Sequence, residues 1–243
     1  MTLARSLAVG AVRGWRTTAG YVTESARIRR AVRQREREVR AYVARQAVRR
    51  LHIGAGNNLL SGWLNTDTIL SEPGLVYMDA TARFPFDDAV FDYVFSEHMI
   101  EHIDYREGLS MLQECRRVMT PGGRIRIATP CADRLVELYR PVKTPLQESF
   151  IRYITDGFMP DVTDHNGAFV VDMYFRGFGH RFLYDHRTLV GSLEQAGFSG
   201  VVEHLPGESD DELLRRIECG ARVHGEEING FATMVFEAVR PQC

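Results

Sequence analysis

The feature that most constrains the fold is an alternation of short apolar runs, turn residues and helical segments, which begins at Leu51 and continues to Ala128. Strands that are separated by crossover helices pair in parallel, because each helix packs back on the sheet. One helix is predicted over Tyr105–Met119, after which a Pro-Gly-Gly sequence stops it. The strand candidates of this region are Leu51–Ile53, Trp63–Asn65, Leu75–Met78, Phe91–Phe95 and Arg124–Ala128. A parallel sheet wrapped by helices is therefore predicted.

Beyond Thr129 the alternation is looser. Helices are expected over Asp133–Tyr139 and Leu146–Ile154. A polar, aromatic-rich stretch with several glycines, Asp161–His180, then looks like an insertion. A further helix is predicted over Asp185–Ala196, where Gly197 caps it.

Two β-rich runs follow this helix, Phe198–Leu205 and Ala232–Val239. They can pair antiparallel at the edge of a sheet. With the five earlier strands they predict an α/β, Rossmann-like, doubly wound fold, in which a mostly parallel seven-stranded sheet has an antiparallel edge strand. This domain is expected over residues 50–243, with an insertion at about 141–182.

Residues 1–49 are predicted to form an Arg-rich N-terminal helical arm of roughly two pieces, divided at Gly20. Residues 1–50 contain 13 Arg and three Glu, a formal charge of +10, whereas residues 51–243 carry −12. Basic helices bind nucleic acid or anionic membrane surfaces. Because the arm's Val and Ala stripe is a poor membrane anchor and the rest of the chain is acidic, we expect it to pack on its own domain or on a second subunit. It would then act as a lid or as part of a homodimer.

The four cysteines lack the C-x-x-C spacing that is typical of zinc sites, and they suggest no disulfide framework. A reducing compartment is therefore expected. Arg5 and Arg13 interrupt an apolar run that is too short for the core of a signal peptide or for a membrane span. We expect a cytoplasmic protein.

A glycine turn, Gly54-Ala55-Gly56-Asn57, directly follows the first predicted strand. Glycine lets the backbone approach a ligand closely, and the ligands of open α/β sheets lie outside the carboxyl ends of the strands. The turn departs from the G-x-G-x-x-G pattern of dinucleotide-binding proteins, because Leu59 occupies the third glycine position. By itself the turn indicates only a ligand-binding loop.

Polar residues follow the other predicted strands in order. Asp67 comes eleven residues after Gly56, and Asp79-Ala80 follows the third strand. Ser96-Glu97-His98 follows the fourth. A carboxylate has two acceptor oxygens and no donor, so it suits a diol or an amine. The order of these residues predicts one ligand site at the ends of the strands.

Over residues 51–140 this ordered set resembles the class I S-adenosylmethionine-dependent methyltransferases. The resemblance implies that Gly54 and Gly56 face the amino-acid tail and the ribose of S-adenosylmethionine. It implies that Asp67 accepts hydrogen bonds from the two ribose hydroxyls, and that Asp79 accepts one from the adenine amine beside the backbone N–H of Ala80. The other cofactor-binding residues that it implies are Ala55, Asn57, Ser96 and Glu97.

Within this superfamily, several segments look like those of a group of small methyltransferases of cell-surface and polysaccharide synthesis. They are GWLNTD, SEHMIEH, GHRFLYD and, later in the chain, GES at residues 207–209 and IE at residues 217–218. With its Arg-rich composition, the chain is most similar to actinobacterial sugar O-methyltransferases that methylate mannoside precursors of polysaccharides. This implies an oligosaccharide acceptor. The insertion would bind it, because aromatic faces stack on sugar rings. Its aromatic candidates are Tyr174, Phe175, Phe178 and Phe182.

Methyl transfer to a hydroxyl requires alignment of the acceptor and removal of its proton. His98, at the rim of the predicted cleft, is the first candidate for the base, with Glu97 or Glu101 as the orienting partner. His180 is the second candidate, because it follows the insertion. His102 is expected to be structural and to complete a buried hydrogen bond at the start of the helix.

Residues 98–102 also fit H-x-x-E-H, the inverted zinc-protease signature. That signature belongs inside a long helix, whereas here it adjoins a predicted strand, so a protease is disfavoured. The histidine pair could instead join Asp161, Asp164 or Asp172 in a divalent-metal site, since some sugar methyltransferases use Mg²⁺. The sequence leaves the metal ligands open.

Two other functions remain as alternatives. An RNA or DNA methyltransferase would use the basic arm to hold nucleic acid. A non-catalytic cofactor-binding subunit would have the cofactor site without transferring a methyl group. Nucleic acid and membrane surfaces are the less favoured partners, because residues 51–243 are acidic.

Overall fold

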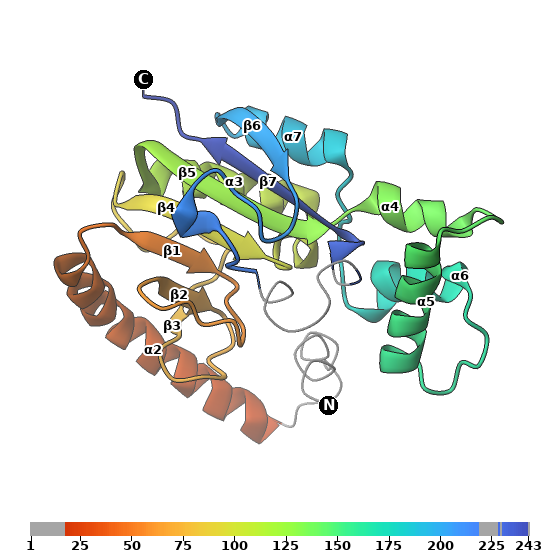
Figure 1. Cartoon of the computed structure of the whole chain (residues 1–243). Helices are drawn as coiled ribbons and strands as arrows, with labels where there is room; N and C mark the ends of the chain where they lie inside the picture. Colours follow the sequence, from red (N-terminus) through yellow and green to blue (C-terminus); the bar gives the residue numbers. More distant parts are fainter. Residues whose placement is uncertain (1–17, 219–227, 229, 243) are drawn as a thin grey trace.

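The computed structural model describes residues 18–218, 228 and 230–242, with side chains from residue 28 onward, and the first part of the predicted arm, residues 1–17, lies outside them. A seven-stranded sheet with the strand order β3-β2-β1-β4-β5-β7-β6 forms the centre (Figure 1). β1 to β5 pair in parallel, and β7 runs antiparallel to both β5 and β6. The predicted doubly wound sheet is confirmed. Its strands are β1 (Arg50–Ile53), β2 (Leu64–Asp67), β3 (Val76–Tyr77), β4 (Phe91–Glu97), β5 (Met119–Pro130), β6 (Ser199–His204) and β7 (Thr233–Val239).

Two helices, α3 (Tyr105–Val118) and α7 (His186–Gln195), cover one face of the sheet and lie behind it in Figure 1. The apolar stripe of α3 is fully buried against this face, as the 3.6-residue period of its sequence predicts. Glu107 starts the helix by accepting a hydrogen bond from the backbone N–H of Asp104, at 2.9 Å. The main core of the protein therefore lies between the sheet and these two helices.

The opposite face of the sheet is covered by the segment that follows β6. This segment contains the short helix η5 (Glu212–Leu214) and passes in front of the sheet in Figure 1. Leu214 and Ile217 pack there against Trp63 and Phe95. The turn between β1 and β2 spans only residues 54–63, so no crossover helix covers this face between them. The late segment takes the place of that helix.

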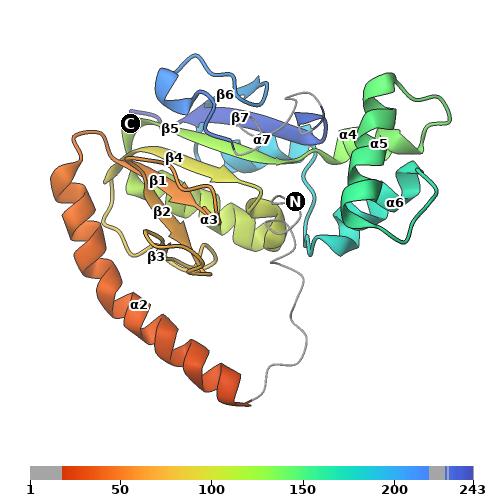
Figure 2. The same ribbon diagram turned by 60° about the horizontal axis from the view of Figure 1, so that its bottom comes forward.

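A separate group of helices lies beyond the carboxyl end of β5 and stands apart from the sheet in Figure 2. We call it the helical unit. Its own core includes Leu138, Phe150 and Val170, and it reaches the sheet at Ala232 beside β7. The predicted insertion falls within it. Its elements are α4 (Ala132–Val136), η3 (Glu137–Tyr139), α5 (Pro145–Phe158), α6 (Gly167–Asp172) and η4 (Met173–Gly177).

The described part of the arm contains the helix α2 (Thr18–Arg45), which passes through Gly20, so no division occurs at that glycine; the first predicted piece falls largely on residues 1–17, outside the described residues. Val39 and Tyr42 pack against the main core, and the Tyr42 hydroxyl accepts a hydrogen bond from the backbone N–H of Arg50 at 2.7 Å. The N-terminal half extends away from the sheet (Figure 2). Among the helices that the structure describes, none has both the length and the hydrophobicity needed to cross a bilayer.

A buried ion network joins the late segment to the sheet. Arg126, in the middle of β5, has no exposed surface. Its Nε lies 2.5 Å from Oε1 of Glu218, and its Nη1 lies 2.5 Å from Oε1 of Glu237 on β7. The second carboxylate oxygen of Glu218 accepts a hydrogen bond from the backbone N–H of Gly207 at 3.2 Å. Both ends of the late segment are thus held to the sheet.

We predict that Arg126→Ala destabilises the protein by about 3–5 kcal/mol, because two buried carboxylates lose their counter-charge. Arg124→Ala is the matched control: Arg124 is 41% exposed and lies 3.7 and 3.8 Å from its acidic partners. Its loss should cost about 1 kcal/mol or less. Urea unfolding measures both values, and equal losses would show that the buried network has no special role.

Candidate active site

The strand order places a topological switch point at the carboxyl ends of β1 and β4. The chain passes from β1 to β2 on one side and returns to β4 on the other, so the loops after these two strands separate. The residues that the sequence predicted for cofactor binding lie at the carboxyl ends of β1 to β4. Each is either among the last residues of a strand or in the loop that follows it. The structure therefore places them all along one edge of the sheet.

The glycine turn after β1 has a left-handed backbone at Gly54 (φ 68°) and Gly56 (φ 49°). At Gly54 a side chain would also overlap that of Met99, whereas the space beside Gly56 is open. Ala55 is buried, and its backbone N–H donates a hydrogen bond to the carbonyl of Thr66 at 3.0 Å. The turn thus leaves its outer side free for a ligand, because no side chain stands at either glycine.

The two predicted acids lie in different local environments. Asp67 ends β2, and its Oδ2 accepts a hydrogen bond from the backbone N–H of Gly56 at 2.9 Å. Asp79 lies beyond β3, where its Oδ1 accepts from the N–H of Thr81 at 2.9 Å and from its hydroxyl at 2.7 Å. Ala80, next to it, is 9% exposed. Asp67 is therefore in direct contact with the glycine turn, whereas Asp79 lies after the neighbouring strand, β3.

Four further predicted or neighbouring side chains complete this edge. Ser96 is buried, and its hydroxyl has no hydrogen-bond partner among the described residues. Glu97 accepts a hydrogen bond from the side chain of Asn58 at 3.1 Å, and Asn58 also donates to the carbonyl of Ile217 at 3.0 Å. Asn57 contacts the hydroxyl of Ser71 at 3.4 Å. Sequence reasoning missed Asn58, although it stands in the same Gly-x-Gly-Asn-Asn turn.

A histidine and a buried glutamate follow β4 directly. His98 has a left-handed backbone (φ 47°), and its Nδ1 lies 3.1 Å from Oε1 of Glu101. Its Nε2 lies 3.3 Å from the hydroxyl of Thr233. Glu101 has no exposed surface, and its Oε2 accepts a hydrogen bond from Thr129 at 2.9 Å. Of the two predicted partners for His98, the structure brings Glu101 into hydrogen-bonding contact.

The electrostatics of this pair favour opposite charges. Burial, the largest effect on His98, lowers its pKa, but the hydrogen bond and the charge of Glu101 outweigh it, so the pKa of His98 is raised. Burial raises the pKa of Glu101, but its hydrogen bond to His98 and the nearby histidines lower it to about 2. Glu101 therefore stays ionised and stabilises a proton on His98.

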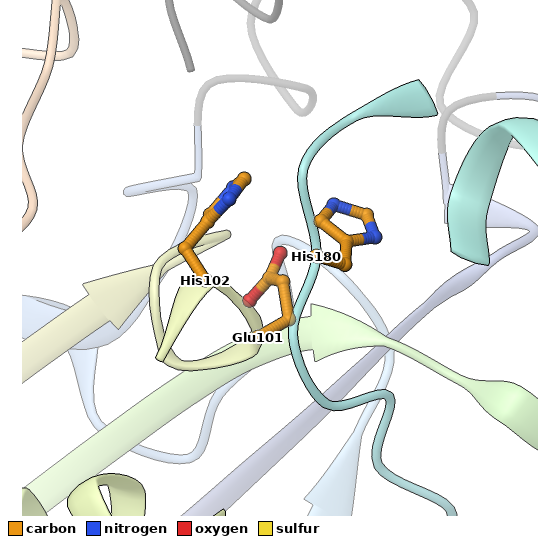
Figure 3. A group of neighbouring side chains, drawn as sticks. All are labelled: Glu101, His102 and His180. Atoms are coloured by element: carbon orange, nitrogen blue, oxygen red, sulfur yellow. The ribbon is translucent and has the colours of Figure 1, made fainter. Parts of the chain in front are cut away.

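In Figure 3, His180 lies on one side of Glu101 and His102 on the other. Its ring packs against that of His102 with 4.9 Å between the centroids, and against the rings of Tyr174 and Phe178 at 5.8 Å. Burial lowers the pKa of His180 to about 4. The Nδ1 atom of this ring is buried, and no described residue forms a hydrogen bond with it.

The surroundings of the other histidines follow from the same segment. As expected, the H-x-x-E-H residues do not lie in a long helix, because His98 directly follows β4 and residues 100–102 form the short helix η2 (Ile100–His102). The start of α3 is capped by Asp104 and Glu107, and the ring of His102 packs against that of His180.

The aspartates that were considered as metal partners of the histidines are not near them in a common cluster. Asp172 forms a hydrogen bond with Arg176 on the surface, at 2.7 Å. Within the described ranges, two clusters of three side chains are close enough to share an ion. One contains Glu101, His102 and His180, and the other contains Cys131, Asp133 and His186. Asp161, Asp164 and Asp172 belong to neither group.

Comparison with known proteins gives one family match. Residues 64–127 match the family model described as "Methyltransferase domain". This range begins in β2 and ends in β5, so it includes the acids after β2 and β3 and the histidines after β4. A search of curated proteins finds no match.

Solved methyltransferases are similar to the chain at low identity. An S-adenosylmethionine-dependent methyltransferase from Archaeoglobus fulgidus is 18% identical, with a TM-score of 0.47, and the match covers 90% of this chain and 93% of that one. Phosphoethanolamine N-methyltransferase 2 from Haemonchus contortus, in complex with S-adenosyl-L-methionine, is 17% identical, with a TM-score of 0.44, over 80% of this chain. The match spans 49% of that enzyme.

Residues 64–127 thus match a methyltransferase domain, and the predicted class of enzyme agrees with this match. The strand order and the glycine turn fit a ligand site at the carboxyl ends of the strands.

We predict that Gly54→Ala destabilises the protein more than Gly56→Ala. Both changes place Ala at a positive φ, which costs about 1–2 kcal/mol. Only Gly54→Ala also forces Met99 to move, which should add about 1–3 kcal/mol. Thermal or urea unfolding gives the two values. In the double variant Gly54→Ala/Met99→Ala the overlap is removed, so its loss of stability should be smaller than the sum of the losses in the two single variants. A loss equal to that sum would contradict the proposed contact.

Proposed function

We propose that the protein is an O-methyltransferase that transfers the methyl group of S-adenosylmethionine to a sugar hydroxyl of an oligosaccharide or polysaccharide precursor. The observation that carries this proposal is the His98–Glu101 pair at the end of β4. A sugar hydroxyl is a weak nucleophile while it carries its proton, so its methylation needs a base to take that proton. A histidine that is hydrogen-bonded to a buried carboxylate is suited to that task.

In this proposal the cofactor lies along the carboxyl ends of β1 to β4. Gly54 and Gly56 allow its ribose and amino-acid tail to approach the backbone, with Ala55 and Asn57 in the same turn. The carboxylate of Asp67 accepts from the ribose hydroxyls, and Asp79, with Ala80, contacts the adenine. Ser96 and Glu97 line the β4 side. The hydrogen bonds of Asp67 support this assignment, because they hold the carboxylate at the turn: Oδ2 accepts from the N–H of Gly56 at 2.9 Å, and Oδ1 accepts from the N–H of Ile69 at 2.8 Å. Each oxygen has a second lone pair that can accept from a ribose hydroxyl.

The chemical step requires little from the protein beyond alignment and proton transfer, because the sulfonium is already activated. Nε2 of His98 takes the proton of the acceptor hydroxyl while the methyl group moves from sulfur to oxygen. Glu101 stabilises the imidazolium that results, as its low pKa favours. Thr233, 3.3 Å from Nε2, would hold the ring in the orientation that the reaction needs. His180 remains the second candidate for the base.

The helical unit is the proposed acceptor site. Of the predicted aromatic residues, Phe175 is 47% exposed and can stack on a sugar ring. Tyr174 and Phe178 instead pack edge-on against each other beside His180, and Phe182 packs against Tyr105 and Tyr184. These three therefore support the site from within. Tyr139, 60% exposed, is an additional candidate that the sequence did not single out.

An RNA or DNA methyltransferase is the second candidate, and the arm favours it. The side chains of α2 are described from residue 28 onward. Among them, Arg40 forms an ion pair with Glu36 of the same helix, at 3.6 Å. No other ion pair is described for the α2 arginines from residue 28 onward, so these side chains could bind phosphates, or the acidic domain of a second subunit in a homodimer. Salt-sensitive binding of nucleic acid that is lost when residues 1–50 are deleted would favour this function over sugar methylation.

We predict that His98→Gln lowers methyl transfer from labelled S-adenosylmethionine to cell glycan extracts by about 10²–10⁴-fold, because the acceptor loses its base. Binding of S-adenosylhomocysteine should persist, since His98 is not among the cofactor-binding residues. His204→Gln is the control, because His204 lies on β6 and pairs with Glu237. If His98→Gln and His204→Gln transfer methyl groups at the same rate, His98 is not the base.

A further inference from the structure

We propose that Glu101, His102 and His180 form a binding site for a first-row transition-metal ion such as Zn²⁺, and not for Mg²⁺. One potential ligand atom from each side chain lies within 4.8 Å of the other two. In Figure 3 the carboxylate of Glu101 lies between the two imidazole rings. Two imidazoles and one carboxylate are a ligand set that suits Zn²⁺ and its neighbours, whereas Mg²⁺ requires a shell of oxygen atoms.

The unsatisfied nitrogen of His180 supports the site. Buried polar atoms are nearly always hydrogen-bonded, so a buried ring nitrogen without a partner requires an explanation. Nδ1 of His180 has no hydrogen-bond partner among the described residues, and the ring packs against those of His102, Tyr174 and Phe178.

The backbone fixes the two halves of the site to each other. Glu101 and His102 are neighbours in η2, whereas His180 comes from the loop that leaves the helical unit. The carbonyl of Glu101 accepts hydrogen bonds from the N–H of Arg181 at 2.7 Å and from that of Phe182 at 3.2 Å. The loop is therefore bonded to the residue that supplies the carboxylate, and the three ligands are positioned before any ion binds.

The second cluster of the described residues, Cys131, Asp133 and His186, does not share these properties. Both nitrogens of His186 already have carboxylate partners, Asp133 at 2.8 Å from Nδ1 and Glu203 at 3.0 Å from Nε2. Burial raises the pKa of the Cys131 thiol, which disfavours the thiolate that a metal would need. That cluster is a satisfied ion network, and it supplies a control for the first.

Three protein ligands leave coordination positions open for a substrate or water. Glu101 contacts His98 as well, so an acceptor oxygen at those positions would lie beside the proposed base and would lose its proton more readily. This role of the ion rests on the proposed function, whereas the binding of the ion does not.

The test is calorimetric titration of the full chain, after treatment with EDTA and its removal, with Zn²⁺ and separately with Mg²⁺. We expect one Zn²⁺ per chain and no Mg²⁺ binding at the same concentrations. His180→Ala and His102→Ala should each weaken Zn²⁺ binding by at least about tenfold. His186→Ala should leave it unchanged. His180→Gln, which keeps a polar side chain, is the second variant if His180→Ala does not fold.

Two results would overturn the site: Zn²⁺ affinity that is unchanged in both His180→Ala and His102→Ala, or affinity that is lost in His186→Ala alone. Stoichiometric Mg²⁺ binding without Zn²⁺ binding would also overturn it. Titration of the same samples with S-adenosylhomocysteine separates this inference from the proposed function. Zn²⁺ binding by a protein that fails to bind S-adenosylhomocysteine would leave the metal site standing and remove the methyltransferase mechanism.

Discussion

The buried carboxylate of Glu101 is the group on which the arrangement of the site depends. A carboxylate without exposed surface is costly unless it is hydrogen-bonded and near positive charge. Glu101 meets both conditions, since it contacts His98 after β4 and accepts a hydrogen bond from Thr129 on β5. Its backbone carbonyl also holds the loop at residues 181–182. One residue thus connects the sheet, the proposed base and the helical unit.

The ion network around Arg126 places a second set of charges next to this site. Glu218 pairs with Arg126, and its negative charge is also among the influences that raise the pKa of His98. The late segment is therefore more than a cover for the sheet, because its anchoring residue contributes to the electrostatics of the cleft. The link between β1 and β2 is too short to form a crossover helix, so the late segment covers that face of the sheet instead.

The sequence was sufficient for the sheet and for its strand-end residues, because both depend on local patterns. Apolar runs and glycines reveal strands and turns directly, and the order of Gly54, Asp67, Asp79 and His98 follows the order of the strands. The contacts of the site were harder to foresee. Thr233 meets His98 across 135 residues, and Glu218 meets Arg126 across 92, and no local pattern encodes such pairs. Of the proposed metal ligands, the sequence suggested His102, whereas it did not suggest His180, because His180 reaches Glu101 only through the path of the helical unit.

The central claim is that the carboxyl ends of β1 to β4 bind S-adenosylmethionine, and calorimetric binding of S-adenosylhomocysteine tests it most directly. We expect the wild-type chain to bind in the micromolar range and Asp67→Asn to bind at least about tenfold more weakly, because a charged acceptor of the ribose hydroxyls is lost. Asp87→Asn, an exposed acid in the turn before β4, should bind as the wild type does. Absence of binding by the wild-type chain, or equal affinities of the two variants, would contradict the account.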